Sequence, residues 1–184
     1  MTGAFPVPLR PLRADDVPRV AELERELFGP SAWSEAMIRG ELTAPGRWYV
    51  AADDPTDAAL ATGVGPDSPG AGSAEAFPGT PLVGYAGLWF DGDVTQVMTI
   101  GVAPGMQRQG IGTALLQALL ERSRDLGATA VLLEVRVDNG PAIALYERLG
   151  FATVSRRKRY YQPEDVDGWT MRLELGTPEG DVVG

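Results

Sequence analysis

The chain of 184 residues contains no cysteine and no histidine. The absence of cysteine excludes disulfides, thiolate metal sites and a cysteine nucleophile. The absence of histidine removes the usual base at neutral pH and the commonest metal ligand in proteins. A general base in this protein must therefore be a carboxylate, a phenol or water, and we expect no metal site.

Basic residues are also scarce, because 16 lysines and arginines stand against 25 acidic residues and give a net charge of -9. An acidic surface lacks the positive field that attracts nucleic-acid phosphates. No apolar run approaches the length of a membrane span, and residues 1–6 have neither the basic nor the apolar region of a signal peptide. These features predict a cytoplasmic, globular protein that binds neither nucleic acid nor membranes.

The chain is organised around a predicted strand, turn and helix. Residues 99–104 form a β-branched run that ends at a proline, and Ile111, Leu115 and Leu119 recur at the spacing of an amphipathic helix. The turn between them, Gln107–Thr113, leads into the start of that helix. The first N–H groups of a helix have no intrahelical partner and lie at the positive end of its dipole. The stretch is therefore either a phosphate site or a simple tight turn.

Two common nucleotide loops do not fit this turn. A mononucleotide loop would place Lys and Ser or Thr after the last glycine, but Gly112 is followed by Thr113. A dinucleotide loop would have a third glycine where Leu115 stands. Gly110 and Gly112 still let a ligand approach the backbone closely, and Arg108 adds a positive charge.

The segments downstream of the turn help to decide between a phosphate site and a simple tight turn. Residues 129–137 predict a buried strand, and Asn139 and Pro141 precede a short helix. The chain resembles the GNAT superfamily of N-acetyltransferases and, more narrowly, the RimI family, which acetylates the N-terminal amine of a small-subunit ribosomal protein. The matching segments are Ile100–Pro104, Gln107–Thr113, Leu133–Arg136 with Asn139, Ala142–Phe151, and Arg156–Arg157 with Tyr160–Tyr161.

The resemblance implies the α/β (α+β) GNAT acyl-CoA N-acyltransferase fold, a mixed, strongly twisted sheet of about six to seven strands with helices on both faces. A chain of this length with 44% hydrophobic residues predicts one domain, over residues 1–176, followed by a flexible tail at 177–184. Residues 53–81 are rich in Gly, Pro, Ala, Ser and Asp, and we expect them to form a disordered insertion. The order of the remaining patterns, an edge strand at 7–13, two helices, strands and the central turn, agrees with that fold.

The two N-terminal helices have sequence signals of their own. Asp15 or Asp16 is expected to cap the first helix, and Ser34 is expected to cap the second. The apolar side of the first helix is predicted to consist of Val17, Val20, Leu23, Leu27 and Phe28.

The resemblance also implies acetyl-CoA as the cosubstrate. Its pyrophosphate would lie on the turn, its pantetheine arm would follow the strand that ends there, and Asn139, which is first of all a helix N-cap, would add a contact. The residues assigned to the cofactor in this way are Ile100, Gly101, Val102, Arg108, Gln109, Gly110, Ile111, Gly112, Thr113 and Asn139.

Two residues are assigned to catalysis. Side-chain alternation places Glu134 on the opposite strand face from Leu133 and Val135, and a carboxylate in a covered strand needs either an ion-pair partner or a chemical role. In the family this glutamate is the general base, which accepts a proton from the acceptor amine directly or through water. Tyr146 is by spacing alone a core aromatic, whereas the resemblance implies that it protonates the departing coenzyme A thiolate.

The residues that would bind the acceptor have two interpretations. The resemblance places Trp33, Arg157 and Tyr160, together with Glu134, along the acceptor site; the alternative is a packed helix corner and an exposed basic edge strand. Deprotonating an α-amine of pKa ~7.8 near neutrality costs about 1 kcal/mol, against about 5 kcal/mol for a lysine of pKa ~10.4.

This difference favours the N-terminal amine of a protein, such as a ribosomal protein, acetylated by direct transfer in a ternary complex. A lysine side chain or small amine is the alternative acceptor, and a non-catalytic acetyl-CoA sensor is the alternative function. The protein is expected to be a monomer or a homodimer.

Overall fold

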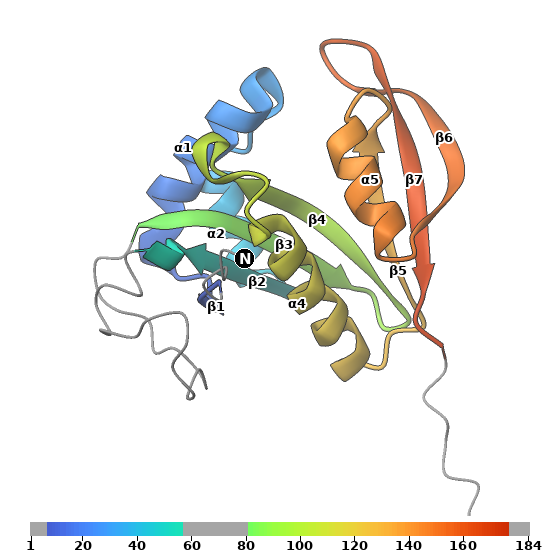
Figure 1. Ribbon diagram of the computed structural model, residues 1–184, viewed down its shortest axis with the longest axis horizontal. Coiled ribbons are helices and arrows are strands. Elements are labelled where there is room, and N and C mark those ends of the chain that lie inside the picture. The colour runs from blue at the N-terminus through green and yellow to red at the C-terminus, as the bar shows by residue number, and fades with distance from the viewer. Residues whose placement is uncertain (1–6, 57–80, 177–184) are drawn as a thin grey trace, which may run out of the picture. The chain divides into compact units, whose positions relative to one another are not determined.

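A computed structural model describes residues 7–56 and 81–176 of the chain (Figure 1). Seven strands form one sheet in the order β1-β2-β3-β4-β5-β7-β6. The pairs β1–β2, β5–β7 and β6–β7 are antiparallel, whereas β4–β5 is parallel. The sheet is therefore mixed, and its strand number agrees with the fold predicted from the sequence.

The helices and strands follow the predicted order. In chain order they are β1 (Leu9–Pro11), α1 (Val17–Phe28), α2 (Glu35–Thr43), β2 (Arg47–Asp53), β3 (Leu82–Phe90), β4 (Val94–Val102), α4 (Ile111–Asp125), β5 (Ala130–Arg136), α5 (Gly140–Arg148), β6 (Ala152–Tyr161) and β7 (Val166–Glu174), with short 3-10 helices at Ala14–Asp16, Gly29–Ser31 and Pro104–Met106. The chain divides into two compact units, one of Met1–Gly87 with Thr99–Ala118 and the other of Leu88–Met98 with Leu119–Gly184. Among the described residues no helix is long and apolar enough to cross a lipid bilayer.

The predicted insertion begins too early. Asp53, its first predicted residue, is the last residue of β2 and is buried, and the Asp54 N–H donates to the carbonyl of Pro81. The prediction of disorder concerns mainly residues 57–80, which lie outside the described residues, as does the predicted tail at 177–184. Both statements stay predictions.

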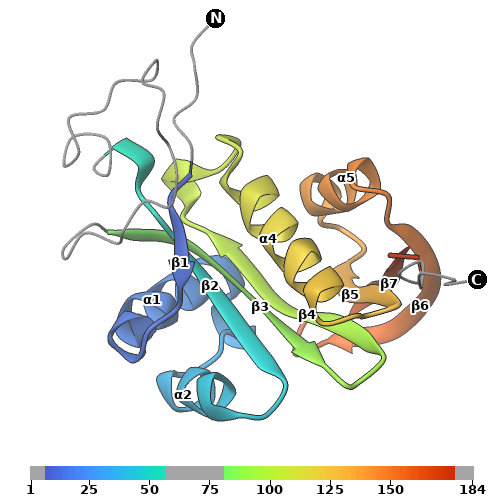
Figure 2. The same cartoon turned by 90° about the horizontal axis from the view of Figure 1, so that it is seen from below.

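In the first unit, β3 is covered by helices on both faces. Neighbouring residues of a strand point to opposite faces. A Cβ added to Gly84 would lie 3.1 Å from Ile111 Cγ2 and 3.1 Å from Leu115 Cδ1 on α4. The next residue, Tyr85, instead donates its hydroxyl to Glu24 on α1. Helices α4 and α1 therefore cover opposite faces of β3, as Figure 2 shows. Helices on both faces of the sheet were predicted from the sequence.

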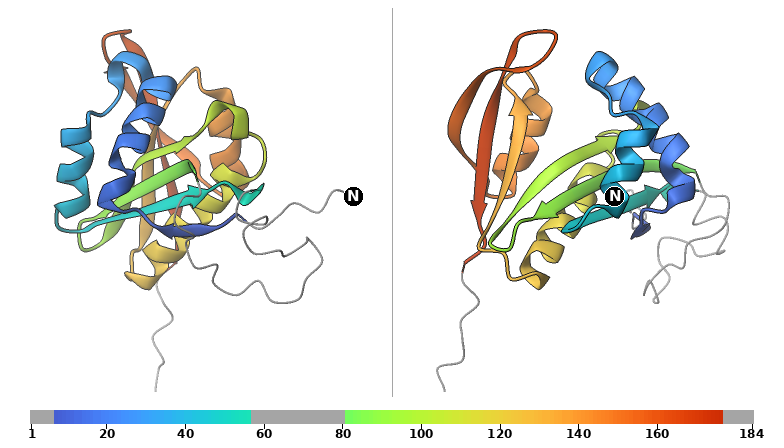
Figure 3. Two further views of the ribbon diagram at one scale, coloured as in Figure 1. Left: turned by 90° about the vertical axis from the view of Figure 1, so that its left-hand side faces the viewer. Right: turned by 180° about the vertical axis from the view of Figure 1, so that it is seen from behind.

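The two N-terminal helices lie side by side (Figure 3, left). Helix α2 begins as predicted, because the Ser34 hydroxyl accepts the N–H of Met37. Helix α1 buries Val17, Val20 and Leu23, but Phe28, which was also predicted on its apolar side, is 38% exposed. The reason is that Phe28 is the last residue of the helix, where the packed face ends.

In the second unit, β5, β7 and β6 adjoin with α5 beside them (Figure 3, right). The register pairs Glu134 of β5 with Thr170 of β7. Helix α5 begins after Asn139, whose side-chain oxygen accepts the N–H of Ala142 at 3.2 Å. The predicted N-cap role of Asn139 is therefore confirmed.

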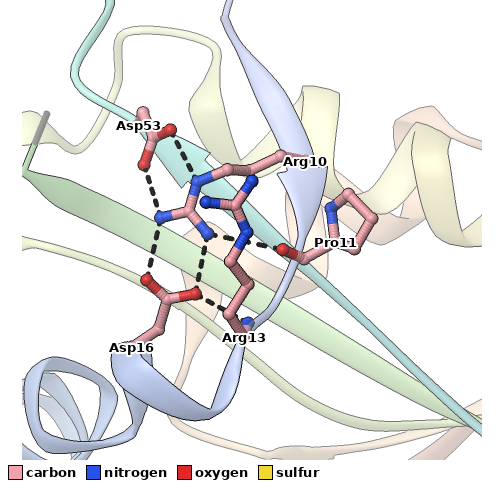
Figure 4. A network of polar contacts seen from close by, with 5 residues as sticks. All are labelled: Arg10, Pro11, Arg13, Asp16 and Asp53. Carbon is pink, nitrogen blue, oxygen red and sulfur yellow. Dashed lines mark hydrogen bonds and ion pairs between the residues drawn. The ribbon is translucent and has the colours of Figure 1, made fainter. Parts of the chain in front are cut away.

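A partly buried arginine, Arg10, joins three segments of the N-terminal region (Figure 4). The Arg10 guanidinium donates to both carboxylate oxygens of Asp16, at 2.7 and 2.8 Å, and to both of Asp53, at 2.8 and 3.0 Å. Asp15 or Asp16 was predicted to cap α1. Asp16 stands at the N-cap position, but its side chain accepts the N–H of Arg13 and makes no capping hydrogen bond to the helix. Burial raises the pKa of Asp16, but the hydrogen bonds from Arg10 and from the Arg13 backbone outweigh that effect and hold it below its usual value.

We expect Arg10→Met to lower the free energy of unfolding by about 3 kcal/mol at pH 7, because Asp16 and Asp53 lose the cation that they share. The effect should shrink in acid. A carboxyl group whose pKa is lowered by folding stabilises the protein above its unfolded pKa of about 3.9, and this contribution is lost as the pH falls through the folded value. Urea unfolding at pH 7 and pH 3, followed by circular dichroism, measures both effects.

Arg39→Met is the matched control, because Arg39 forms an exposed ion pair with Glu35 whose side chains are 51% and 49% exposed. We expect a change below about 1 kcal/mol at either pH. An Arg10→Met effect that matched this control would contradict the proposed role of the buried network.

Candidate active site

The turn between β4 and α4, in the first unit, offers unpaired backbone N–H groups. Arg108 and Gly110 have positive φ values of 61° and 87°. The Ala114 N–H donates to the carbonyl of Gly110 at 2.9 Å, which makes it the first helical donor. The N–H groups of Ile111–Thr113 therefore have no partner within the helix and lie at its positive end. This arrangement suits a phosphate group.

Side chains of the turn hold its shape. The amide of Gln107 donates to the carbonyl of Val102 at 3.1 Å, and that of Gln109 donates to the carbonyl of Gly105 at 3.2 Å. The Ile111 side chain is 1% exposed, so this predicted cofactor residue offers a ligand only its backbone. Arg108, in contrast, is an exposed cation.

The end of β4 is fixed against β3. A Cβ on Gly101 would lie 2.8 Å from atoms of the Tyr85 ring, so a glycine is required there for packing. One residue past the strand, the Ala103 N–H donates to the carbonyl of Val83 at 2.8 Å. Ile100–Val102, which were assigned to the cofactor, therefore form a rigid strand end in the same unit as the turn.

Glu134, on β5 in the second unit, is held by two side chains. Arg157 Nη1 lies 3.1 Å from Glu134 Oε1, and the Thr170 hydroxyl lies 3.0 Å from Oε2 and 3.2 Å from Oε1. The Glu134 side chain is 13% exposed. The cross-strand ion pair considered from the sequence is thus present, and it holds the carboxylate in one orientation at a solvent-accessible position.

Arg157 also contacts Tyr160. Its guanidinium carbon lies 4.2 Å from the centre of the Tyr160 ring, which is a cation–π distance. The hydrogen bond to Glu134 raises the pKa of Arg157, so it stays charged. Three predicted site residues, Glu134, Arg157 and Tyr160, are therefore brought together. Thr170 completes the group; nothing in the sequence pattern distinguishes it from other strand threonines.

Tyr146, on α5, is buried. It is 5% exposed, and its ring centre lies 5.9 Å from that of Phe151. Burial raises the pKa of Tyr146 to about 12. The phenol therefore keeps its proton throughout the neutral range, as a proton donor must.

Asn139 and Trp33 each have a structural partner. The side-chain oxygen of Asn139 caps α5, which leaves its amide N–H groups available to a ligand. The backbone N–H of Trp33 donates to Glu24 Oε2 at 3.0 Å. Glu24 was not among the predicted site residues, although it falls four residues after Val20, on the apolar face of α1, where a buried acid is unusual.

The part of the chain that the structure describes has no group of three or more His, Cys, Asp or Glu side chains that could hold a metal ion.

Comparisons with known proteins give the family. The chain matches the acetyltransferase (GNAT) family over residues 22–151. It is 38% identical over 178 residues to the N-alpha-acetyltransferase RimI of Mycobacterium tuberculosis. The match covers 94% of this chain and 96% of that protein. It is 44% identical over 73 residues to the ribosomal protein bS18-alanine N-acetyltransferase of Escherichia coli, over 40% of this chain and 49% of that protein.

The fold comparison agrees. A crystal structure of the ribosomal-protein-S18-alanine N-acetyltransferase from Escherichia coli has a TM-score of 0.71 and 26% sequence identity, and the match covers 96% of this chain and 97% of that one. This chain therefore belongs to the GNAT acetyltransferase family. The family resemblance and the fold predicted from the sequence are both confirmed.

The positive φ of Gly110 in the turn can be tested by substitution. Gly110 has a φ of 87° with nothing within 4 Å of an added Cβ, so Gly110→Ala meets only backbone strain. We expect it to lower the free energy of unfolding by about 1–2 kcal/mol in urea titrations.

Gly105→Ala, in the same turn, is the control. An added Cβ there also has nothing within 4 Å, and Gly105 does not have a positive φ. We expect a change within about 0.5 kcal/mol. Equal losses in the two variants would contradict the strained conformation of Gly110.

Proposed function

We propose that this protein transfers the acetyl group of acetyl-CoA to the N-terminal α-amine of a protein, with a ribosomal protein as the favoured acceptor. The relatives named above, which are N-terminal acetyltransferases by name, support this proposal. The observation that carries it is the pairing of functions in the second unit: Glu134 is an oriented, accessible carboxylate, and Tyr146 is a phenol that keeps its proton.

Acetyl-CoA would supply the acetyl group as an activated thioester. The backbone N–H groups of Ile111–Thr113 and the Arg108 guanidinium would bind its pyrophosphate, since both are positive and neither is used within the turn. The open space around Gly110 lets that anion approach the backbone. Ile100–Val102 would bind the pantetheine arm, and the free amide of Asn139 would add a hydrogen bond.

Glu134 is the proposed general base. Its carboxylate accepts the proton that the acceptor amine loses, directly or through water, as the amine nitrogen forms its bond to the acetyl carbon. Tyr146 gives its phenolic proton to the sulfur as the carbon–sulfur bond breaks. Direct transfer in a ternary complex is favoured, because a chain without cysteine has no thiol to carry the acetyl group.

Trp33, Arg157 and Tyr160 would border the acceptor peptide. Arg157 pairs with Glu134 and lies over the Tyr160 ring, so a peptide that brings its amine to Glu134 would approach Arg157 and Tyr160. The cost of deprotonation favours an α-amine, at about 1 kcal/mol near neutrality, over a lysine, at about 5 kcal/mol. An oriented carboxylate is adequate as the base for the cheaper step.

The proposal is tested by offering acetyl-CoA with three acceptors: a peptide with the N-terminal sequence of ribosomal protein S18, a lysine peptide with a blocked N-terminus, and a polyamine. We expect the first to be acetylated at least tenfold faster than the others, with the acetyl group located on the α-amine by mass spectrometry. Faster acetylation of the blocked peptide or the polyamine would support a different acceptor class. Binding of acetyl-CoA in calorimetry with no transfer to any acceptor would support a sensor.

The proposed acid and base are tested by Glu134→Gln and Tyr146→Phe. Each variant removes one proton-transfer group with little change of shape, so we expect kcat to fall more than tenfold while the calorimetric Kd for acetyl-CoA changes less than threefold. Glu147→Gln is the control, because Glu147 is exposed and next to Tyr146 in the sequence. Near-normal turnover in both site variants would refute the assignment.

A further inference from the structure

Glu24 is an acidic residue that the proposed reaction does not use, and it is 2% exposed in the middle of α1. A carboxylate this deeply buried is retained only if hydrogen bonds replace its water shell. A leucine would fill the same kind of position on an amphipathic helix at no such cost. The contacts of Glu24 are therefore the place to look for its role.

Three neutral donors from three different segments meet this carboxylate. The Tyr85 hydroxyl on β3 donates to Oε1 at 2.7 Å, the Thr99 hydroxyl on β4 donates to Oε1 at 3.1 Å, and the Trp33 backbone N–H donates to Oε2 at 3.0 Å. All of these residues belong to the first unit. Burial and the nearby carboxylate of Glu24 raise the pKa of Tyr85, so its hydroxyl stays a donor.

The three segments have different assignments in the reaction. Thr99 is next to Ile100–Val102, the strand end assigned to acetyl-CoA. Trp33, assigned to the acceptor, stands in the link between the 3-10 helix Gly29–Ser31 and α2, where no strand pairing fixes the backbone. The hydrogen bond to Glu24 ties this link to the central strands through Tyr85 and Thr99.

We propose that Glu24 is a positioning residue: it fixes the segment at Trp33 to β3 and β4 and so holds Trp33 in the position from which it contacts the acceptor. This role rests on the proposed function, because it assumes that Trp33 borders the acceptor. Glu24 itself does not touch the reacting atoms.

The kinetic test compares Glu24→Ala with Glu24→Gln. Alanine removes all three hydrogen bonds. Glutamine keeps an oxygen for the Trp33 N–H, and its amide can donate to the hydroxyls of Tyr85 and Thr99 once these turn. For Glu24→Ala we expect the acceptor KM to rise at least tenfold with the acetyl-CoA KM within twofold, and for Glu24→Gln we expect less than a threefold change in either.

Glu22→Gln is the matched control, because Glu22 lies on the same helix with its side chain 53% exposed, in a surface pair with Arg19. It should leave both KM values unchanged. A rise of both KM values together in Glu24→Ala would show a general loss of structure and would overturn the positioning role.

A second measurement does not depend on activity. Hydrogen exchange of the Trp33 amide should be slow in the unaltered protein and in Glu24→Gln, and at least tenfold faster in Glu24→Ala. If Glu24→Ala does not fold, Tyr85→Phe and Thr99→Val, each of which removes one donor, should raise the acceptor KM more than the acetyl-CoA KM.

The outcomes separate the two proposals. An unaltered protein that acetylates no acceptor would overturn both the proposed function and this role. An active protein whose acceptor KM is unchanged in Glu24→Ala, or in both donor variants, would overturn the role of Glu24 alone.

Discussion

Two neighbouring residues of β3, Gly84 and Tyr85, face opposite sides of the sheet and determine how helices pack in the first unit. Gly84 has no side chain, so α4 packs directly on that face through Ile111 and Leu115. Tyr85 fills the other face, where its ring requires a glycine at position 101 and its hydroxyl binds Glu24. A side chain at position 84 would press on Ile111 and Leu115 in the first turns of α4, the end of the helix that carries the proposed anion site. The position of that helix end therefore depends on a packing constraint one strand away.

Two glutamates show how the same side chain serves different purposes in different surroundings. Glu24 is enclosed and binds three neutral donors, so its oxygens are occupied and it can only hold structure. Glu134 is 13% exposed, and one of its partners, Arg157, is itself 50% exposed on β6. An exposed arginine can exchange a carboxylate for another partner or for water at little cost. Glu134 can therefore gain a proton without leaving a buried charge unpaired.

Much of the fold could be predicted from the sequence, because local rules and tertiary packing agree there. Ser34 and Asn139 were predicted as helix caps from residue type and position, and both side chains accept the expected N–H groups. The predicted elements recur in the predicted order. Phe28 was wrongly placed on the packed face, since periodicity does not say where a helix stops being covered. Thr170 and Glu24 were missed, because their partners are set by strand register and by helix packing, which no local pattern contains.

The absence of histidine from the sequence limits the groups that can transfer protons in this protein. A histidine could act as both base and acid near neutrality, whereas the proposed mechanism divides those tasks between Glu134 and Tyr146. Burial makes Tyr146 a phenol that keeps its proton, so it suits the leaving group and cannot serve as the base. In the proposed mechanism the base is therefore a carboxylate, which takes a proton more easily from an amine of lower pKa. An N-terminal amine, about 4 kcal/mol less costly to deprotonate near neutrality than a lysine, is the acceptor that this mechanism favours.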